Sequence, residues 1–529
     1  MPLLDDLRIE GAVPVAGHGY PGARYGILSG FEPGTRTLEA HFQIAPPFKP
    51  LPVDIVLDKD VPVTLRDGVT IHVDVFRPAG AEKVPVIVAW SPYGKGQGTS
   101  ASVMGIFGMV GLDNGIVSGL AKFEGPDPKY WCAQGYAICT PGIRGVVDSE
   151  GDSVVWDRQE GRDCYDLIEW LGVQDWCTGK VGMSATSYLA VSQWFTAVEQ
   201  PPHLAAINPW EGVSDVYRDL VLRGGMPDTG FAEQLQNNSY WGRGQREEWL
   251  RIHNSQEWPD YCDEANTEDL RRFFDHFLKG EDNGWDQTPR VRYSLLDLEG
   301  GDRVNIPADQ FPPADVQLTR YHLDGRSRTL GTTAPADEAT AGYTVGANPD
   351  VVSFVTRFDQ ETTLVGYPKA HLWVEAKGHD DMDLFILVQK LDAYGTPLQQ
   401  FTVPNQGALI QDVTERGASI LRYKRSDGRL RVSMRHLDEK LSTEAIPAHS
   451  FDRVEKLSPG EVVDVEIDLL PVGLTFYPGE QLRLVISGRS LLGTTMPGNR
   501  EHTPANKGQH IVHTGGERAS YLQIPVKPA

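Results

Sequence analysis

The chain has 529 residues, which is too long for one compact core and predicts two or three domains. Its 72 Asp and Glu outnumber 49 Lys and Arg, and the resulting formal charge of −23 opposes binding to nucleic acid or to anionic lipid. The N-terminal residues have neither a basic start nor an apolar stretch, and no run of about 18 apolar residues occurs. We therefore expect a cytoplasmic protein without a nucleic-acid or membrane partner.

The cysteines are odd in number and none has CxxC spacing. They are Cys132, Cys139, Cys164, Cys177 and Cys262. This set favours reduced, structural thiols over a disulfide framework, a zinc site or a catalytic cysteine. We expect neither a metal nor a cofactor.

The first half of the chain predicts a sheet covered by helices. Residues 1–50 are rich in Gly and Pro and predict an arm, and residues 61–76 predict a hairpin that turns at Gly68. Four continuous apolar runs are typical of strands buried on both faces: 84–90, 136–139, 181–183 and 204–207. Helical patterns separate them, most clearly over 159–171, where Cys164, Leu167, Ile168 and Leu171 share one face. This alternation predicts a mostly parallel sheet with helices on both faces.

The second half predicts a different architecture. A helix over 273–280 ends at Gly280, and beyond Pro289 short alternating strands follow with few helices between them. The clearest strands lie at 371–374, 384–388, 430–434, 462–467 and 482–486. This pattern predicts an all-β sandwich with a domain boundary near residue 290.

Residues 181–190 predict a strand, a tight turn and a helix, with Ser187 in the turn. A nucleophile elbow has this layout and needs small neighbours, which Ala185 and Ala190 provide. The usual Gly-x-Ser-x-Gly is absent, because Leu189 occupies the second Gly position. The alternative is that Ser187 only caps the following helix.

Four stretches carry a resemblance to a known family. They are Ser91-Pro92-Tyr93-Gly94-Lys95, the segment from Gly142-Ile143-Arg144-Gly145 to Gly151, the segment from Ile168 to Trp194 around Ser187, and three stretches of the predicted sandwich (381–384, 430–435 and 477–482). The combination resembles the cocaine esterase and X-prolyl dipeptidyl aminopeptidase family of α/β-hydrolases, and is also similar to the α-amino-acid ester hydrolases.

The resemblance implies an α/β fold: an α/β-hydrolase domain with a reduced helical cap, followed by an all-β jelly-roll sandwich. The expected divisions are an arm at 1–50, a hydrolase core at 51–209, a shortened cap at 210–248, the rest of the core at 249–289 and the jelly roll at 290–529. Ser187 is then the nucleophile. The backbone N–H of Tyr188 and the hydroxyl of Tyr93 would form the oxyanion hole, which agrees with the donor positions this fold uses. The alternative for Tyr93 is a turn aromatic packed on the core.

The sequence departs from the family pattern after Ser187. Between Ser187 and Phe273 the only strand-like run after residue 207 is 249–253, and no Asp follows an apolar strand there. We infer that a segment carrying the triad acid is absent, through a natural deletion or through an error in gene prediction, so the triad acid is unknown. Loss of a core strand would leave an apolar sheet edge, which favours association into a homo-oligomer.

The histidine of the triad is displaced as well. His253 is the only histidine at that strand end, and it is the candidate base, with Glu257 or Asp260 as the orienting carboxylate. The alternative is a structural histidine with its hydrogen bonds satisfied. His203 and His276, on a loop and a helix, are weaker candidates.

Three functions remain open at this stage. The leading hypothesis is hydrolysis of an ester or amide of a small-molecule or peptide substrate through an acyl-serine, with transfer of the acyl group to an alcohol or amine as a variant. The second is a catalytically silent relative that lacks its acid and base. The third is sugar binding by the sandwich, for which Trp373 alone supplies too few aromatics. The run His379-Asp380-Asp381-Met382-Asp383 suggests a metal site, but we expect it to be structural because Asp383 leads into a strand.

Overall fold

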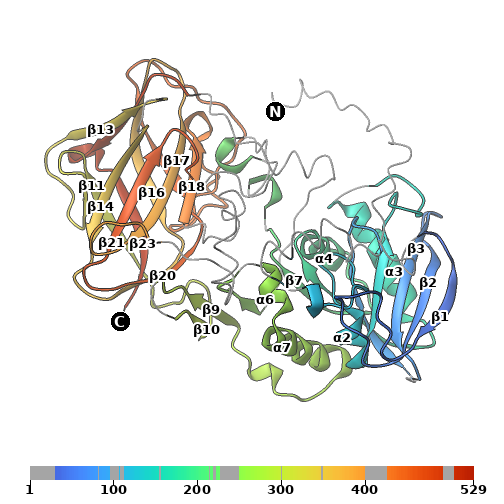
Figure 1. The fold of residues 1–529 in the computed structure, drawn as a ribbon. Coiled ribbons are helices and arrows are strands. Elements are labelled where there is room, and N and C mark those ends of the chain that lie inside the picture. Colours follow the sequence, from blue (N-terminus) through green and yellow to red (C-terminus); the bar gives the residue numbers. More distant parts are fainter. Residues whose placement is uncertain are drawn as a thin grey trace.

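The computed structural model describes residues 30–80, 83–95, 107, 112, 114–153, 156–213, 215–218, 222–226, 249–255, 257–298, 301–346, 350–398, 426–491 and 506–528. Most of the expected arm (1–29) and most of the expected cap (227–248) therefore lie outside the described residues. The described residues form two lobes, a mixed α/β lobe and a β lobe (Figure 1). No helix in this part of the chain is long and apolar enough to cross a membrane.

The first lobe is built on a seven-stranded sheet of order β1-β2-β3-β5-β4-β6-β7. Its strands are β1 (Gly34–Leu38), β2 (Ile55–Thr64), β3 (Thr70–Pro78), β4 (Val84–Val88), β5 (Ala137–Gly142), β6 (Cys177–Thr186) and β7 (Leu204–Trp210). β5, β4, β6 and β7 run parallel, and β1 to β3 add an antiparallel edge. Every residue of β4 is buried, as its continuous apolar sequence predicts.

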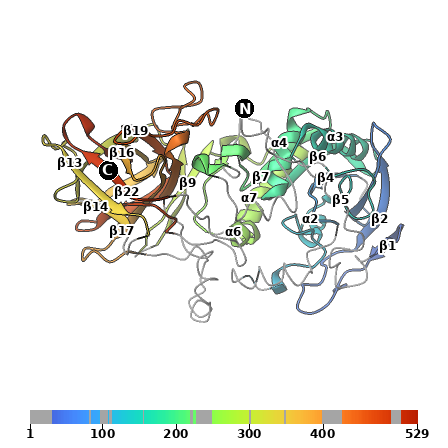
Figure 2. The same ribbon diagram turned by 90° about the horizontal axis from the view of Figure 1, so that it is seen from above.

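Helices cover both faces of this sheet. They are α2 (Pro128–Ala133), α3 (Arg158–Gly172), α4 (Tyr188–Val198), α6 (Glu257–Cys262) and α7 (Glu264–Phe274). Figure 2 shows α3 and α4 on one side and α2 on the other. The α3 side chains predicted to share a face pack on one side of the sheet, while Leu270 and Phe274 of α7 pack with Trp131 of α2 on the other. The prediction of a helix over 159–171 is confirmed, and Asp157 caps its first turn.

The second lobe contains only strands and short 3-10 turns among its described residues. Its strands are β11 (Gln317–Asp324), β12 (Thr329–Gly331), β13 (Ala339–Thr344), β14 (Val351–Arg357), β15 (Thr362–Gly366), β16 (Lys369–Lys377), β17 (Asp383–Leu391), β18 (Ser426–Arg431), β19 (Val462–Asp468), β20 (Val472–Phe476), β21 (Gln481–Ser487), β22 (Gln509–Thr514) and β23 (Tyr521–Lys527). They curl around one apolar core (Figure 2). The side chains that form this core come from alternate positions of the strands, which point to the inner face. The predicted all-β domain is confirmed.

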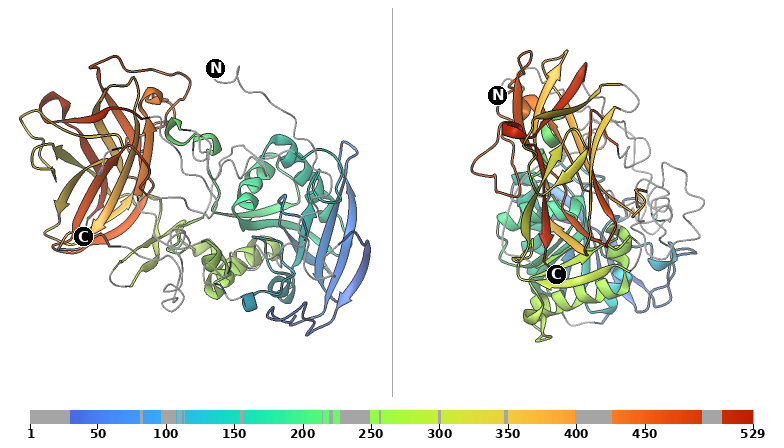
Figure 3. Two further views of the ribbon diagram at one scale, coloured as in Figure 1. Left: turned by 45° about the horizontal axis from the view of Figure 1, so that its top comes forward. Right: turned by 90° about the vertical axis from the view of Figure 1, so that its left-hand side faces the viewer.

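A small three-stranded sheet lies between the lobes (Figure 3). It consists of β8 (Leu250–Arg251), β9 (Val291–Leu295) and β10 (Arg303–Ala308). The strand expected at 249–253 is thus reduced to two residues, and it pairs in parallel with β9 rather than with β7. In the described part of the chain, β7 is therefore an end strand of the large sheet.

The described part of the cap region contacts the second lobe. Arg218 donates a hydrogen bond of 2.7 Å to the carbonyl of His449, and Arg223 pairs with Asp427 at 3.1 Å. Gly224 has φ +61°, and a Cβ there would lie 1.9 Å from the carbonyl oxygen of Arg429. Only glycine permits this close approach of the two backbones.

Candidate active site

Ser187 occupies a sharp turn between β6 and α4. Its backbone angles are φ 60° and ψ −120°, and its side chain does not cap the helix. These angles are strained for a residue with a side chain, and such strain concentrates at functional sites. The geometry is that of a nucleophile elbow. The structure does not contain the side-chain cap that the alternative for Ser187 requires.

Small residues let β6 and α4 approach in place of the usual glycines. Ala185 and Ala190 are fully buried. A Cβ on Gly182 would lie 2.9 Å from the ring of Phe274, so Gly182 admits α7 against the strand. A Gly-x-Ser-x-Gly sequence is therefore not required here, because the positions that must be small are small.

Tyr93 and Tyr188 lie next to each other beside this turn. Their ring centroids are 6.0 Å apart in an edge-to-face arrangement, and Tyr93 also contacts Phe123 at 5.3 Å. Tyr93 follows β4, and Tyr188 is the first residue of α4. The structure thus brings the two residues predicted to form the oxyanion hole to the same edge of the sheet as Ser187, at the C-terminal ends of the parallel strands.

His253 faces two carboxylates. Its Nε2 lies 2.5 Å from Oε1 of Glu211, and its Nδ1 lies 3.9 Å from Oδ2 of Asp260. Burial lowers the pKa of His253, but the hydrogen bond and charge of Glu211, with the charge of Asp260, outweigh burial and leave the pKa raised. Within the described contacts His253 bonds to Glu211 and not to Ser187.

The other residues weighed for the base or its partner lie elsewhere or act on other groups. His203 precedes β7, at the strand end opposite to Trp210, and pairs with Glu169 at 2.9 Å. His276 pairs with Asp286 at 3.4 Å. Glu257 begins α6, and its charge adds to burial in raising the pKa of Glu124.

A buried carboxylate on α3 connects Tyr188 with Trp90. Glu160 accepts hydrogen bonds of 2.9 Å from the Tyr188 hydroxyl and 2.9 Å from the Trp90 indole. Burial raises the pKa of Glu160 to about 7. The place of Glu160 in the first turn of α3 does not indicate its burial, which depends on tertiary packing.

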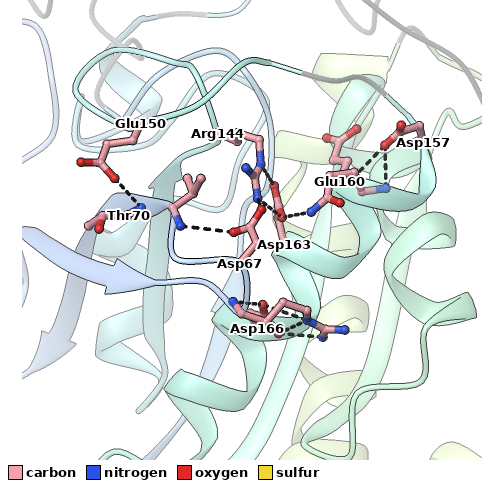
Figure 4. A network of polar contacts seen from close by, with 11 residues as sticks. Asp67, Thr70, Arg144, Glu150, Asp157, Glu160, Asp163 and Asp166 are labelled. Atoms are coloured by element: carbon pink, nitrogen blue, oxygen red, sulfur yellow. Dashed lines mark hydrogen bonds and ion pairs between the residues drawn. The ribbon is translucent and has the colours of Figure 1, made fainter.

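The loop after β5 fixes the start of α3 (Figure 4). Arg144 donates to both carboxylate oxygens of Asp163 on α3, at 2.6 and 2.8 Å, and also to Asp67 at 2.7 Å. Gly145 and Gly151, both at positive φ, allow this loop to fold tightly. The stretch that carries the family resemblance here is therefore a support for α3 and, through Glu160, for the site.

Lys122 is a second buried support. Its ammonium donates to the carbonyls of Ala89, Ser91 and Pro141, at 3.2, 2.9 and 2.7 Å. Burial lowers its pKa to about 7. Because Ala89 and Ser91 lead into Tyr93, Lys122 anchors the loop that carries the expected oxyanion donor.

The two residues after Lys122 contact Tyr93, the end of β6 and α6. Phe123 packs on Tyr93, and the carbonyl of Glu124 accepts the N–H of Thr186 at 3.4 Å, directly before the elbow. The carboxylate of Glu124 accepts from the Trp258 indole at 3.3 Å, and burial raises the pKa of Glu124 well above its usual value. Nothing in the local sequence distinguishes this segment from a surface loop, so its position beside Ser187 was not predictable.

Acidic side chains in the run at 379–383 are bound by other side chains of this protein. Asp381 accepts from Ser433 at 2.7 Å and from Lys456 at 2.9 Å, and Asp383 accepts from Arg431 at 2.7 Å. Among the described residues, no group of three His, Cys, Asp or Glu side chains is placed to hold a metal ion. The contacts given for Asp381 and Asp383 are hydrogen bonds within the β lobe.

Comparison with known proteins identifies both lobes. Residues 67–290 match the X-Pro dipeptidyl-peptidase (S15 family), and residues 283–523 match the X-Pro dipeptidyl-peptidase C-terminal non-catalytic domain. A CocE/NonD family hydrolase from Staphylococcus aureus is 30% identical with a TM-score of 0.81, over 94% of this chain and 97% of that one. An α-amino acid ester hydrolase, 16% identical with a TM-score of 0.59, shares the fold.

The curated relatives match over a shorter stretch. Cocaine esterase from Rhodococcus sp. (strain MB1 Bresler) is 33% identical over 159 residues, which are 30% of this chain and 24% of the esterase. The match thus spans about a quarter of the length of that relative. On the near full-length match to the Staphylococcus aureus protein and the two matched domains, this chain belongs to the CocE/NonD family of hydrolases, with an S15-type α/β-hydrolase domain followed by its C-terminal β domain.

Proposed function

We propose that this protein is a serine hydrolase that cleaves an ester or amide through an acyl-Ser187 intermediate. The observation that carries the proposal is the strained backbone of Ser187, with φ 60° and ψ −120°, between β6 and α4. That turn presents the hydroxyl at the C-terminal edge of a parallel sheet, where this fold performs its chemistry.

The proposed reaction has two halves. The Ser187 oxygen attacks the substrate carbonyl while its proton passes to His253, and the N–H of Tyr188 with the hydroxyl of Tyr93 stabilises the oxyanion. His253 then gives the proton to the leaving group. Water next attacks the acyl carbon while His253 takes a proton from it, and His253 returns a proton to the Ser187 oxygen as the acyl–Ser187 bond breaks. If an alcohol or amine replaces that water, the same intermediate gives acyl transfer.

Family membership supports two substrate classes. The matched family is named for release of X-Pro dipeptides from a peptide, and the curated relative is named as an esterase of cocaine. We therefore propose testing p-nitrophenyl acyl esters and X-Pro p-nitroanilides in parallel. The ratio of kcat/KM between the two series would separate an esterase from a dipeptidyl-peptidase.

The first test is covalent labelling with a fluorophosphonate probe, followed by mass spectrometry of the modified peptide. We expect the label on Ser187, its loss in Ser187→Ala, and its retention in Ser184→Ala, a matched change on the same strand. Circular dichroism would confirm that each variant is folded.

A catalytically silent relative is the second candidate. It is favoured by the contacts of His253, which pairs with Glu211 at 2.5 Å and has its other nitrogen 3.9 Å from Asp260. A histidine held as an imidazolium cannot accept the serine proton. Folded wild-type protein that takes no label between pH 6 and 9 would establish this candidate and reject the first.

A further inference from the structure

We infer that Glu211 is the carboxylate that orients His253, in the role the family assigns to an acid on a later strand. This inference rests on the proposed function. It names a positioning residue that the sequence pattern does not reveal, because Glu211 directly follows β7 rather than the strand that would come after the cap.

The fold brings Glu211 to the nucleophile. β6 and β7 pair in parallel with Thr186 opposite Trp210, and the N–H of Ser187 donates to the carbonyl of Trp210 at 2.9 Å. Ser187 and Glu211 come directly after this pair of residues. They therefore lie next to each other where the two strands end.

The Glu211 backbone is fixed in an uncommon conformation. Its φ is +56°, which is rare for a residue other than Gly, Asn or Asp. The next residue, Gly212, lies against α4, where an added Cβ would be 3.3 Å from Nε1 of Trp194 and 3.5 Å from Cβ of Ala190. The turn is thus packed against the helix that starts at Ser187, and it directs the Glu211 carboxylate to His253.

The pairing fixes the tautomer of His253. An ionised carboxylate only accepts hydrogen bonds, so the nitrogen that faces Glu211, Nε2, carries the hydrogen and Nδ1 carries the lone pair. Nδ1 is buried and has no hydrogen-bond partner. In the reaction the O–H bond of Ser187 breaks as its oxygen bonds to the substrate carbonyl carbon, the proton binds Nδ1, and Glu211 stabilises the resulting imidazolium until the leaving group takes that proton.

Asp260 does not fit this role. Arg251 binds both of its carboxylate oxygens, at 2.6 and 3.1 Å, and Asn266 donates to it at 3.0 Å. Its 3.9 Å separation from Nδ1 of His253 is too long for a hydrogen bond. The charged groups that act on His253 are Glu211, Asp260 and Arg251, and Glu211 is the one that holds it directly.

The test compares Glu211→Gln with Glu169→Gln. Glu169 pairs with His203 at 2.9 Å and is a similar, partly exposed Glu–His pair at the other end of the sheet. The measurement is the pH profile of kcat/KM and of the fluorophosphonate labelling rate. We expect Glu211→Gln to lower both rates about 10³-fold or more near pH 7 and to move the acidic limb to lower pH, because the charge that raises the pKa of His253 is gone.

The controls separate the possible failures. Glu169→Gln should leave the profile unchanged, and Glu211→Asp should restore part of the rate if a carboxylate is what matters. Wild-type labelling of Ser187 with an unaltered rate and profile in Glu211→Gln would overturn the inference and leave the proposed function standing. Absence of label in the wild type would instead reject the proposed function.

Discussion

The phenol of Tyr188 donates a hydrogen bond of 2.9 Å to the buried carboxylate of Glu160. The same carboxylate accepts from the Trp90 indole, so α3 connects the residue after Ser187 to the segment that follows β4. Glu160 thus holds Tyr188 and the start of the segment that leads to Tyr93 in fixed positions. Such preorganisation is the largest contribution to catalysis in many hydrolases.

Glu160→Gln is expected to change how stability depends on pH. Burial raises the pKa of Glu160 from 4.5 to about 7, so the folded state binds more protons than the unfolded state between those values. Stability conferred by this group is complete below pH 4.5 and is lost as pH rises through 7, by about 3 kcal/mol. Denaturant unfolding of wild type and variant at pH 5, 6, 7 and 8 should show a shallower decline in the variant. Parallel curves would contradict this prediction.

Tyr93→Phe is expected to lower kcat by about 10² to 10³-fold with little change in KM. The variant keeps the ring that packs on Phe123 and Tyr188 and removes only the hydroxyl. Steady-state kinetics on an ester substrate would measure the effect. An unchanged kcat would show that Tyr93 is a packing residue, the alternative that its sequence context also allows.

Lys122→Met is expected to destabilise the protein by at least about 3 kcal/mol, because three buried carbonyls lose their donor. The loop before Tyr93 should also lose its anchor, which would lower kcat. Lys180→Met is the control, since Lys180 is exposed. Chemical denaturation of both variants measures the difference, and equal midpoints would refute the prediction.

Gly224→Ala is expected to weaken the contact between the cap region and the second lobe. The added Cβ would overlap the carbonyl of Arg429, and the positive φ adds backbone strain. We expect a lower Tm and faster proteolysis near residue 224. Gly280→Ala serves as a control, because it has a similar φ of +73° and open space around its Cα. Equal losses in both variants would mean that strain, and not the contact, is responsible.

The elbow was predictable because its signal is local. A buried strand, small residues and the start of a helix within ten positions constrain the turn at Ser187, and the structure has that turn. The all-β second half was predictable for a similar reason, since alternating side chains indicate strands whatever their partners are.

The supports of the site were not predictable from local patterns. Lys122 and Glu160 are charged residues of a kind that usually lies at the surface. Only the packing of β4, β5 and α4 around them shows that they are buried. The position of Glu211 beside His253 was not predictable either, because Glu211 follows β7 and not the later strand on which the family pattern places an acid. The partner of β8 was not predictable, since a two-residue strand carries no periodicity.

The pairing of β8 with β9 determines when the site can form during synthesis. His253 directly follows the short segment that β9 holds, and β9 in turn pairs with β10, which ends at Ala308. Ser187, the Tyr93 loop and Glu211 all lie within the first 211 residues of the chain. A ribosome must therefore translate nearly a hundred residues past Glu211 before the histidine can be held in place. A nascent or truncated chain that stops short of the small sheet would carry Ser187 and Glu211 without a fixed His253.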